Sequence, residues 1–276
     1  MKISNVISFW FSATGTTKKV AEHLGMNIAK HLNANFESIS FNLPSSRTDK
    51  YAFTDTDIVV FGVPVYAGRV PNLLMPFIRD NIQGGGALAV PVCLFGNRNF
   101  DDALIELRNI LTENNFQAIS AGAFVGEHSF SKILGAGRPD ENDMKMADEL
   151  ASITVCRVKQ LESGHDVAIP VFVDGCEPIR PYYTPRDRYN NPINILKVKP
   201  KTNAEKCISC GLCARICPMG AISNTDFSNV EGTCIKCCAC EKKCPAGAKY
   251  FDDEGYLYHK HELEEIYIER AECRIY

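Results

Sequence analysis

Eight cysteines in two matching groups constrain this chain more than any other feature of its sequence. Each group has the spacing C-x2-C-x2-C-x3-C followed by proline, and the second group begins 27 residues after the first. The repeat extends beyond cysteine, because Gly220 is matched by Gly247 and Ala221 by Ala248. This pattern indicates a duplicated half-module that binds metal.

The cysteine spacing is typical of two 4Fe-4S clusters with crossed ligation. Three thiolates at intervals of three bind one face of a cubane cluster, and the fourth, before proline, reaches the neighbouring cluster. We therefore expect cluster one to take Cys207, Cys210, Cys213 and Cys244, and cluster two to take Cys234, Cys237, Cys240 and Cys217. The alternative is zinc, whose usual pattern pairs two C-x2-C knuckles across a longer gap. Three cysteines within seven residues, twice over, favour iron-sulfur.

Cys238 stands in the repeat position that Gly211 holds in the first group. It lies outside the ligand spacing, so we expect a bystander near cluster two. The alternative is a redox-reactive thiol.

Composition limits the remaining possibilities. The chain has 276 residues, of which 45% are hydrophobic and 23% charged, as in folded proteins of one or two domains. A net charge of -3 gives no reason to expect nucleic acid or a membrane as partner. With no apolar run of about 20 residues and no export signal at its start, we expect a cytoplasmic protein whose cysteines serve redox chemistry.

Strands and helices alternate through residues 1–169. Hydrophobic patterning predicts strands at residues 6–11, 36–41, 57–63, 87–95 and 118–125, and helices at 18–32, 73–82, 101–114 and 143–161. Such alternation implies a parallel sheet covered on both faces. We therefore predict a doubly wound, flavodoxin-like α/β fold with five parallel strands, in which ligands bind beyond the carboxyl ends of the strands.

The rest of the chain divides into three parts. Residues 170–202 form a Pro-rich linker, which we expect to be extended and to lie against a surface. Residues 203–253 form the cysteine module, a small α+β domain with two clusters. Residues 254–276 form a helical tail, in which Leu263, Ile266, Tyr267 and Arg270 share one face.

A loop of hydroxyls and glycine joins the first strand to the first helix. Its residues are Ser12, Ala13, Thr14, Gly15, Thr16 and Thr17. Backbone N–H groups and the helix dipole favour an anion here, so the loop fits a phosphate. The alternative is an ordinary capped helix start. The loop resembles the first loop of the flavodoxin family, Ser/Thr-x-Thr-Gly-x-Thr, which binds the phosphate of FMN.

Two further loops stand where this resemblance implies contacts with the flavin ring. The first contains Pro64, Tyr66, Ala67, Gly68 and Arg69, and the second contains Gly96, Asn97, Arg98 and Asn99. We expect Tyr66 to stack on the ring, Gly68 to turn a peptide toward flavin N5, Arg69 to neutralise reduced flavin, and Asn97 and Arg98 to meet the pyrimidine edge. Core and turn roles are the alternatives for Gly68 and Arg69. His128, after the fifth strand, is expected to be solvated rather than catalytic.

Residues 203–252 resemble the bacterial two-cluster ferredoxins, and the whole chain is similar to flavodoxin and ferredoxin fusion proteins of anaerobic bacteria and archaea. That resemblance implies electron transfer between FMN, two 4Fe-4S clusters and a redox partner protein, with no catalytic acid, base or nucleophile. One alternative is a flavin-dependent oxidoreductase that turns over a quinone, a ferric chelate or a nicotinamide. Another is a redox sensor whose domains rearrange on reduction.

Overall fold

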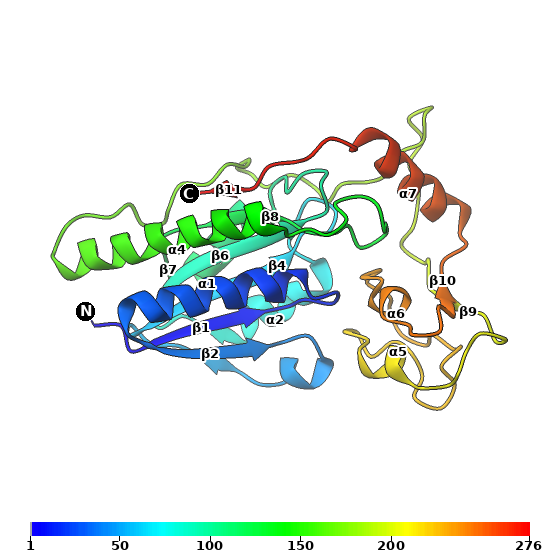
Figure 1. Ribbon diagram of the computed structural model, residues 1–276, viewed down its shortest axis with the longest axis horizontal. Coiled ribbons are helices and arrows are strands. Elements are labelled where there is room, and N and C mark those ends of the chain that lie inside the picture. The colour runs from blue at the N-terminus through cyan, green and yellow to red at the C-terminus, as the bar shows by residue number, and fades with distance from the viewer. Residues whose placement is uncertain (1) are drawn as a thin grey trace.

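The computed structural model describes residues 2–276, and its N-terminal part is a twisted sheet between two layers of helices (Figure 1). Five strands run parallel, in the order β2, β1, β4, β6, β8, which is the order of the predicted doubly wound fold. They span Asn35–Ser40, Asn5–Trp10, Asp57–Pro64, Leu88–Phe95 and Gly122–Val125. The prediction of the fold is confirmed.

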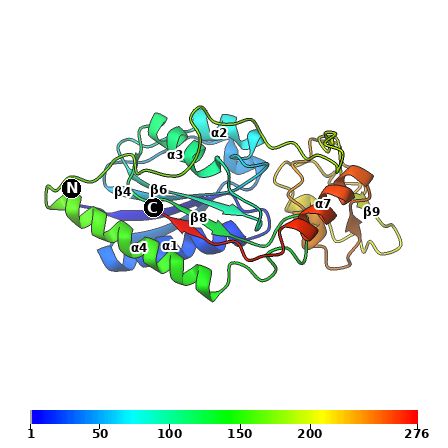
Figure 2. The same cartoon turned by 90° about the horizontal axis from the view of Figure 1, so that it is seen from above.

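Side chains at alternate positions of the strands pack in two apolar clusters, one on each face of the sheet. Val6, Ile58 and Val60 face α1 (Thr16–Leu32) and α4 (Glu141–Glu162). Phe9 and Phe61 face the opposite side, where α2 (Met75–Asp80) and α3 (Ala103–Glu113) lie. Figure 2 shows the two helical layers with the sheet between them. Four of these strands, all except the exposed edge strand β2, are buried and read as continuous apolar runs, which is why the sequence located them.

Short elements depart from the predicted pattern. The helix expected at residues 73–82 is divided into a 3-10 turn, Asn72–Leu74, and α2, followed by β5 (Ile82–Gln83), which pairs with β3 (Tyr51–Ala52). Another 3-10 turn spans Pro44–Arg47. The strand expected at 118–125 is split into β7 (Gln117–Ala118) and β8, because its register against β6 shifts by one residue between Ala118, opposite Ala89, and Gly122, opposite Val92.

The C-terminal segment returns to the first domain. Helix α7 spans Glu254–Ile266, so Tyr267 and Arg270, which we expected on this helix, lie beyond its end. The chain then continues to β11 (Arg274–Ile275), which pairs antiparallel with β8 at the edge of the sheet. This strand was not predicted, because two residues carry no readable pattern. The tail is therefore part of the first domain's sheet.

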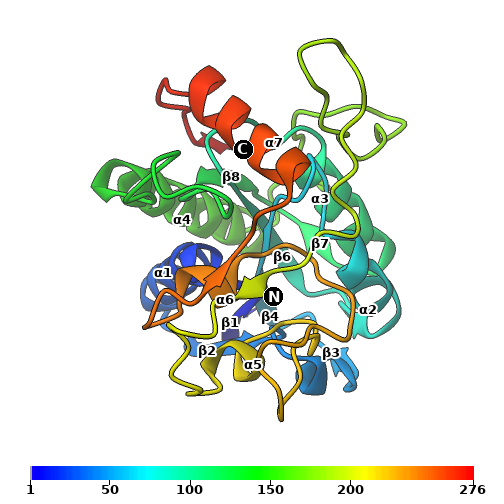
Figure 3. The same ribbon diagram turned by 90° about the vertical axis from the view of Figure 1, so that its right-hand side faces the viewer.

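The cysteine module lies beyond the carboxyl ends of the parallel strands (Figure 1), and it faces the viewer in Figure 3. A short ladder closes it, between β9 (Lys201–Thr202) and β10 (Lys249–Tyr250). Each half contains one helical turn, α5 (Leu212–Arg215) or α6 (Ala239–Lys242). The two halves share backbone conformation, since Gly220 and Gly247 both have φ of 59°.

The linker packs against the first domain, as predicted. Val171 is buried and donates its N–H to the carbonyl of Ala118 at 2.8 Å. Arg180 binds the buried carboxylate of Asp102 through two nitrogens, at 2.8 and 2.6 Å. None of the helices within residues 2–276 is long and apolar enough to cross a membrane.

Candidate cofactor sites

The loop after β1 is built to receive an anion. Asn42 clamps its first residue, because the amide oxygen of Asn42 accepts the Ser12 N–H at 2.6 Å and its nitrogen donates to the Ser12 carbonyl at 3.0 Å. Gly15, at φ of 117°, is the N-cap residue of α1, whose first turn has no acidic residue. The Ser12 Oγ is buried and lacks a hydrogen-bond partner among the described residues. A phosphate would supply the missing partner.

This loop opens into a small cavity that the sheet edge and the cysteine module share. Thr14, Thr16 and Thr17 line it, together with His128 and Cys237. The fifth strand contributes Gly126, where a Cβ would lie 3.1 Å from the side chain of Thr16. The phosphate loop and a thiol of the second cysteine group therefore border the same space.

The second loop forms a tight turn. Tyr66 and Arg69 exchange backbone hydrogen bonds of 2.9 and 3.1 Å, and Ala67 and Gly68 between them have φ of 52° and 77°. A Cβ on Gly68 would lie 2.5 Å from a carboxylate oxygen of Asp101, so glycine is needed here. The Gly68 carbonyl accepts the Asp102 N–H at 3.1 Å. For Gly68 to turn its peptide toward flavin N5, as predicted, this hydrogen bond to Asp102 would have to break.

Arg69 lies away from the position that we expected. Its guanidinium binds both carboxylate oxygens of the buried Glu106 and donates to the Arg180 carbonyl at 2.6 Å. Hydrogen bonds to Glu106 raise the pKa of Arg69 further, against the effect of burial. Because the charge is already balanced, the predicted neutralisation of reduced flavin by Arg69 has no support in this geometry.

Residues of the third loop have two different roles: some line a cavity, and one holds the C-terminal tail. Gly96, Arg98 and Asn99 line a large cavity, as a flavin contact would require. Asn97 is buried and instead holds the C-terminal tail: its amide nitrogen donates to the carbonyls of Tyr267 and Glu269 at 2.7 and 2.8 Å, and its oxygen accepts the Ala271 N–H at 3.1 Å. The predicted contact of Asn97 with the pyrimidine edge is therefore corrected, because these bonds occupy its amide.

The large cavity, which we call the interdomain cavity, has a volume of about 840 Å³. Six parts of the chain line it: the second loop, the third loop, the segment at residues 128–130, the linker at residues 182–185 and 192–196, the cysteine module at residues 233–236, and α7. Pockets of a few hundred to about 1,000 Å³ accommodate flavin-sized ligands. The residues of the first domain and of the module thus enclose one site.

Tyr66 lies between this cavity and the second cysteine group. It lines both cavities and packs in the same apolar cluster as Ile235 and Cys237. Burial, followed by the charges of the nearby thiols of Cys237, Cys238 and Cys234, raises the pKa of Tyr66 well above its ordinary value. The side chain that we expect to stack on a flavin is thus also next to thiols.

Two histidines line the interdomain cavity: His128, which we expected to be solvated, and His259, which the sequence did not single out. His128 is half-buried rather than fully solvated, and burial lowers its pKa to about 3, with the charges of His259, Lys242 and Arg98 acting in the same direction. Its Nδ1 accepts the Phe130 N–H at 3.1 Å. His259, on α7, is 5% exposed, and its Nδ1 has no hydrogen-bond partner among the described residues. Only the fold brings α7 to the flavin loops.

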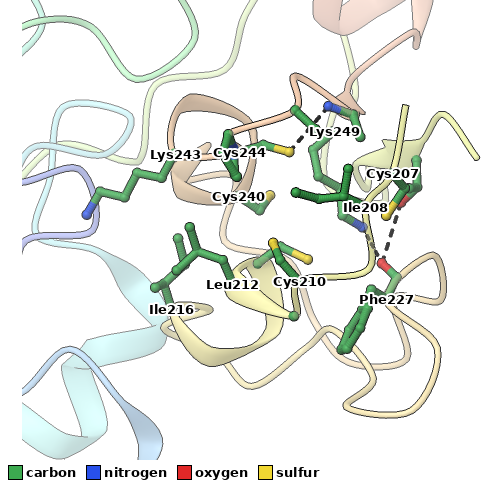
Figure 4. Close-up of a pocket in the computed structure, with 16 residues that line it drawn as sticks. Cys207, Ile208, Cys210, Leu212, Ile216, Phe227, Cys240, Lys243, Cys244 and Lys249 are labelled. Carbon is green, nitrogen blue, oxygen red and sulfur yellow. Dashed lines mark hydrogen bonds between the residues drawn. The ribbon is translucent and has the colours of Figure 1, made fainter. Parts of the chain in front are cut away.

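The eight thiols gather around two separate cavities. The first is lined by Cys207, Cys210, Cys213 and Cys244 with Cys240 at its border, and Figure 4 shows several of them with Ile208 and Phe227. The second is lined by Cys217, Cys234, Cys237 and Cys240, with Cys238 beside them. Each group's fourth cysteine therefore lies with the other group, as crossed ligation requires. Within residues 2–276, no three such side chains converge on a position for a single metal ion.

Matching backbone groups donate to the thiols of both halves. The Ala221 N–H bonds to Cys217 Sγ, and the Ala248 N–H to Cys244 Sγ, both at 3.3 Å. Hydrogen bonds to sulfur stabilise thiolate and tune bound clusters. The donor set therefore fits two 4Fe-4S clusters.

Cys238 is isolated from solvent. It is 1% exposed, and its Sγ lies 3.3 Å from the Tyr256 hydroxyl. Burial raises the pKa of this thiol well above its ordinary value, so the geometry favours a bystander over a reactive thiol.

Polar contacts fix the module to the first domain. Lys242 Nζ on α6 donates to the carbonyls of His128 and Ser131, at 2.6 and 2.8 Å, and pairs with Glu127 at 2.5 Å. Arg47 donates to the carbonyls of Phe41 and Pro218. These bonds join the module to the first domain.

Comparisons with known proteins address both units. Residues 7–119 match the family model described as a flavodoxin domain, and residues 200–223 match the model of a 4Fe-4S binding domain. No curated protein matches the chain significantly.

Similar solved structures include three that relate to the first unit. A flavodoxin from the domain Archaea is 16% identical, with a TM-score of 0.42 over 56% of this chain and 99% of that one. A flavodoxin of Streptococcus pneumonia TIGR4 is 16% identical, with a TM-score of 0.40 and coverage of 56% and 99%. Rubredoxin oxygen:oxidoreductase from the anaerobe Desulfovibrio gigas is 14% identical, with a TM-score of 0.38 and coverage of 58% and 38%.

Proposed function

Because this chain is a fusion of a flavodoxin domain with a 4Fe-4S ferredoxin-like region, we propose that it transfers electrons between FMN, two 4Fe-4S clusters and an external redox protein. FMN supplies one- or two-electron chemistry, and each cluster supplies one-electron chemistry. The protein's own contribution is to bind, orient and shield these groups.

The first domain has the groups that FMN needs. Ser12 and the amides at the start of α1 would hold the phosphate, and the unpartnered Ser12 Oγ is the observation that supports this. Tyr66 and Arg98 would border the ring from the second and third loops. Arg98 is itself held in place by Asp101 and by the ring of Tyr183, 4.6 Å away.

The proposal of a second cluster is supported by features of this chain itself, because the matched family model covers only the first cysteine group. Its support is the repeated spacing, the repeated backbone conformation at Gly220 and Gly247, and the crossed grouping of the thiols.

A single observation carries the proposal of electron transfer. The interdomain cavity is bounded by both flavin loops and by Cys234, and the cavity at the phosphate loop is bounded by Cys237. A flavin and a cluster would therefore be neighbours without any movement of the domains. The bonds of Lys242 and Arg47 across the interface disfavour a sensor that works by domain rearrangement.

The test is anaerobic purification with assays of flavin, iron and sulfide. We expect about one FMN and about eight irons per chain. Zinc in place of iron would contradict the cluster assignment, and about four irons would contradict the second cluster. Absence of flavin after reconstitution with FMN would contradict the role of the first domain.

A second candidate is turnover of a small molecule at the flavin. His259, a titratable side chain that lines the interdomain cavity together with the flavin loops and lies 3.6 Å from Glu262, favours it. Steady-state reduction of a quinone or oxidation of NAD(P)H at tens per second, lost in His259→Leu, would support this candidate. Rates indistinguishable from free FMN would leave electron transfer between proteins as the function.

A further inference from the structure

The two cysteine groups differ in their distance from the flavin loops and in their exposure. We propose that a one-electron redox protein docks on the face formed by Ile208, Ser209 and Cys210, which we call the exit face, and not at the flavin cavity. This inference rests on the proposed function and adds the place of contact and the kind of partner.

The second group is the inner one. Cys237 and Cys240 are buried, and Ile235 and Cys237 belong to the apolar cluster of the first domain that contains Phe9 and Phe61. Cys234 and Cys237 also line the cavities that the flavin loops border. An inner group enclosed in this way is closed to a protein partner.

The first group is the outer one. Cys210 is exposed, and Ile208 beside it is 66% exposed although it is a large apolar residue. The four thiols assigned to cluster one are Cys207, Cys210, Cys213 and Cys244; they line only the first of the two cysteine cavities, and none of them lines the interdomain cavity. In Figure 4, Cys207 lies on the side of this cavity away from the ribbons of the first domain. The outer group is therefore where a partner protein can approach.

The flavin cavity is shielded from protein-sized partners. The linker covers it with Tyr182, Tyr183 and Pro185, and α7 adds His259 and Leu263. The linker is tied down in turn, since the Tyr183 N–H donates to the Ala67 carbonyl at 2.8 Å and the Tyr182 hydroxyl to the Val70 carbonyl at 2.8 Å. The linker and α7 therefore contribute to the walls of this cavity and restrict the approach of a folded protein to the flavin loops.

Charges around the exit face indicate the chemistry of the partner. Lys206 and Arg215 are exposed on either side of it, and Arg215 donates to the Cys210 carbonyl at 2.9 Å. Within residues 203–216, Glu205 is the one exposed carboxylate, so the exposed charges of Glu205, Lys206 and Arg215 sum to +1. An apolar centre with a cationic rim fits an acidic protein that carries a one-electron centre.

Each encounter exchanges a single electron. When the chain is the donor, it is oxidised by one electron and the partner is reduced by one. No bond or proton changes, because 4Fe-4S clusters transfer electrons only.

Two matched variants test the exit face. Ile208→Glu places a charge at its centre, whereas Ile268→Glu changes an equally apolar residue, 75% exposed, beyond the end of α7. The probe is an acidic two-cluster bacterial ferredoxin, mixed by stopped flow with the dithionite-reduced holoprotein. We expect transfer to fall about tenfold in Ile208→Glu at low salt and to be unchanged in Ile268→Glu, as for a hot-spot residue against a neutral surface site.

Further readouts separate docking from damage. Iron content, the EPR spectrum of the reduced clusters and oxidation by a small viologen should match wild type in both variants. Equal rates for Ile208→Glu and wild type, or a slower rate in Ile268→Glu, would overturn the exit face. Preparations that lack flavin or contain zinc would overturn the proposed function instead, so the two failures are distinguishable.

Discussion

Asn97 connects the flavin loops to the C-terminal tail, and its replacement has a calculable effect. Three hydrogen bonds join its amide to residues 267–271, and each contributes about 1 kcal/mol net. Asn97→Gly should therefore lower the free energy of local opening of the tail by about 3 kcal/mol, which speeds amide exchange there on the order of a hundredfold. Glycine is the appropriate substitute because Asn97 has φ of 65°.

Hydrogen exchange of the holoprotein, followed by mass spectrometry over residues 267–276, measures this opening. Asn97→Ala should open the tail further, because a Cβ at this φ adds about 1 kcal/mol of backbone strain. Asn99→Gly is the matched control, since Asn99 is exposed and its side chain accepts only the N–H of Asp101. If exchange in Asn97→Gly stays within threefold of wild type, the amide is not what holds the tail.

Three further predictions follow from the site. Ser12→Ala should weaken FMN binding about tenfold, measured by flavin fluorescence on the flavin-free protein, because it removes the unpartnered hydroxyl; unchanged affinity would contradict its role. Arg69→Met should leave FMN affinity unchanged but lower the free energy of unfolding by about 3 kcal/mol, since it leaves Glu106 buried and unpaired. Arg98→Met, in contrast, should weaken FMN binding. The reverse order of FMN affinities would contradict the assignment. The folded-state pKa of His128, about 3, lies below its unfolded value of about 6.5, so the unfolded chain binds more protons and stability falls as pH drops from about 6.5 toward 3. Between pH 7.5 and 5.5, the melting temperature of His128→Gln should therefore decline less than that of the wild type. An equal decline would contradict this prediction.

Local patterns in the sequence were sufficient to predict the candidate cofactor ligands. Ligand spacing in a C-x2-C-x2-C-x3-C group operates within a dozen residues, and the crossed grouping of Cys217 and Cys244 follows from the repeat. The loop at residues 12–17 is likewise local, because a strand end, a glycine and a helix start suffice to build it. The fold was also predictable from the sequence, because the apolar runs of the buried parallel strands are long enough to be recognised as strands.

Tertiary structure decided which polar groups remain available. Arg69 and Asn97 sit in the correct loops, yet each is occupied by a partner far along the chain, Glu106 in one case and residues 267–271 in the other. No local pattern signals such a partner, because hydrogen bonds between distant segments depend on where the segments pack.

The same reason explains the cover of the flavin cavity and the order of the two cysteine groups. The linker, α7 and β11 are placed by long-range contacts, and through them His259 reaches the cavity and Cys234 borders the flavin loops. The two cysteine groups have the same spacing, so spacing cannot rank them. Only the packing of Ile235 and Cys237 against the first domain makes one group inner and leaves Cys210 at the surface.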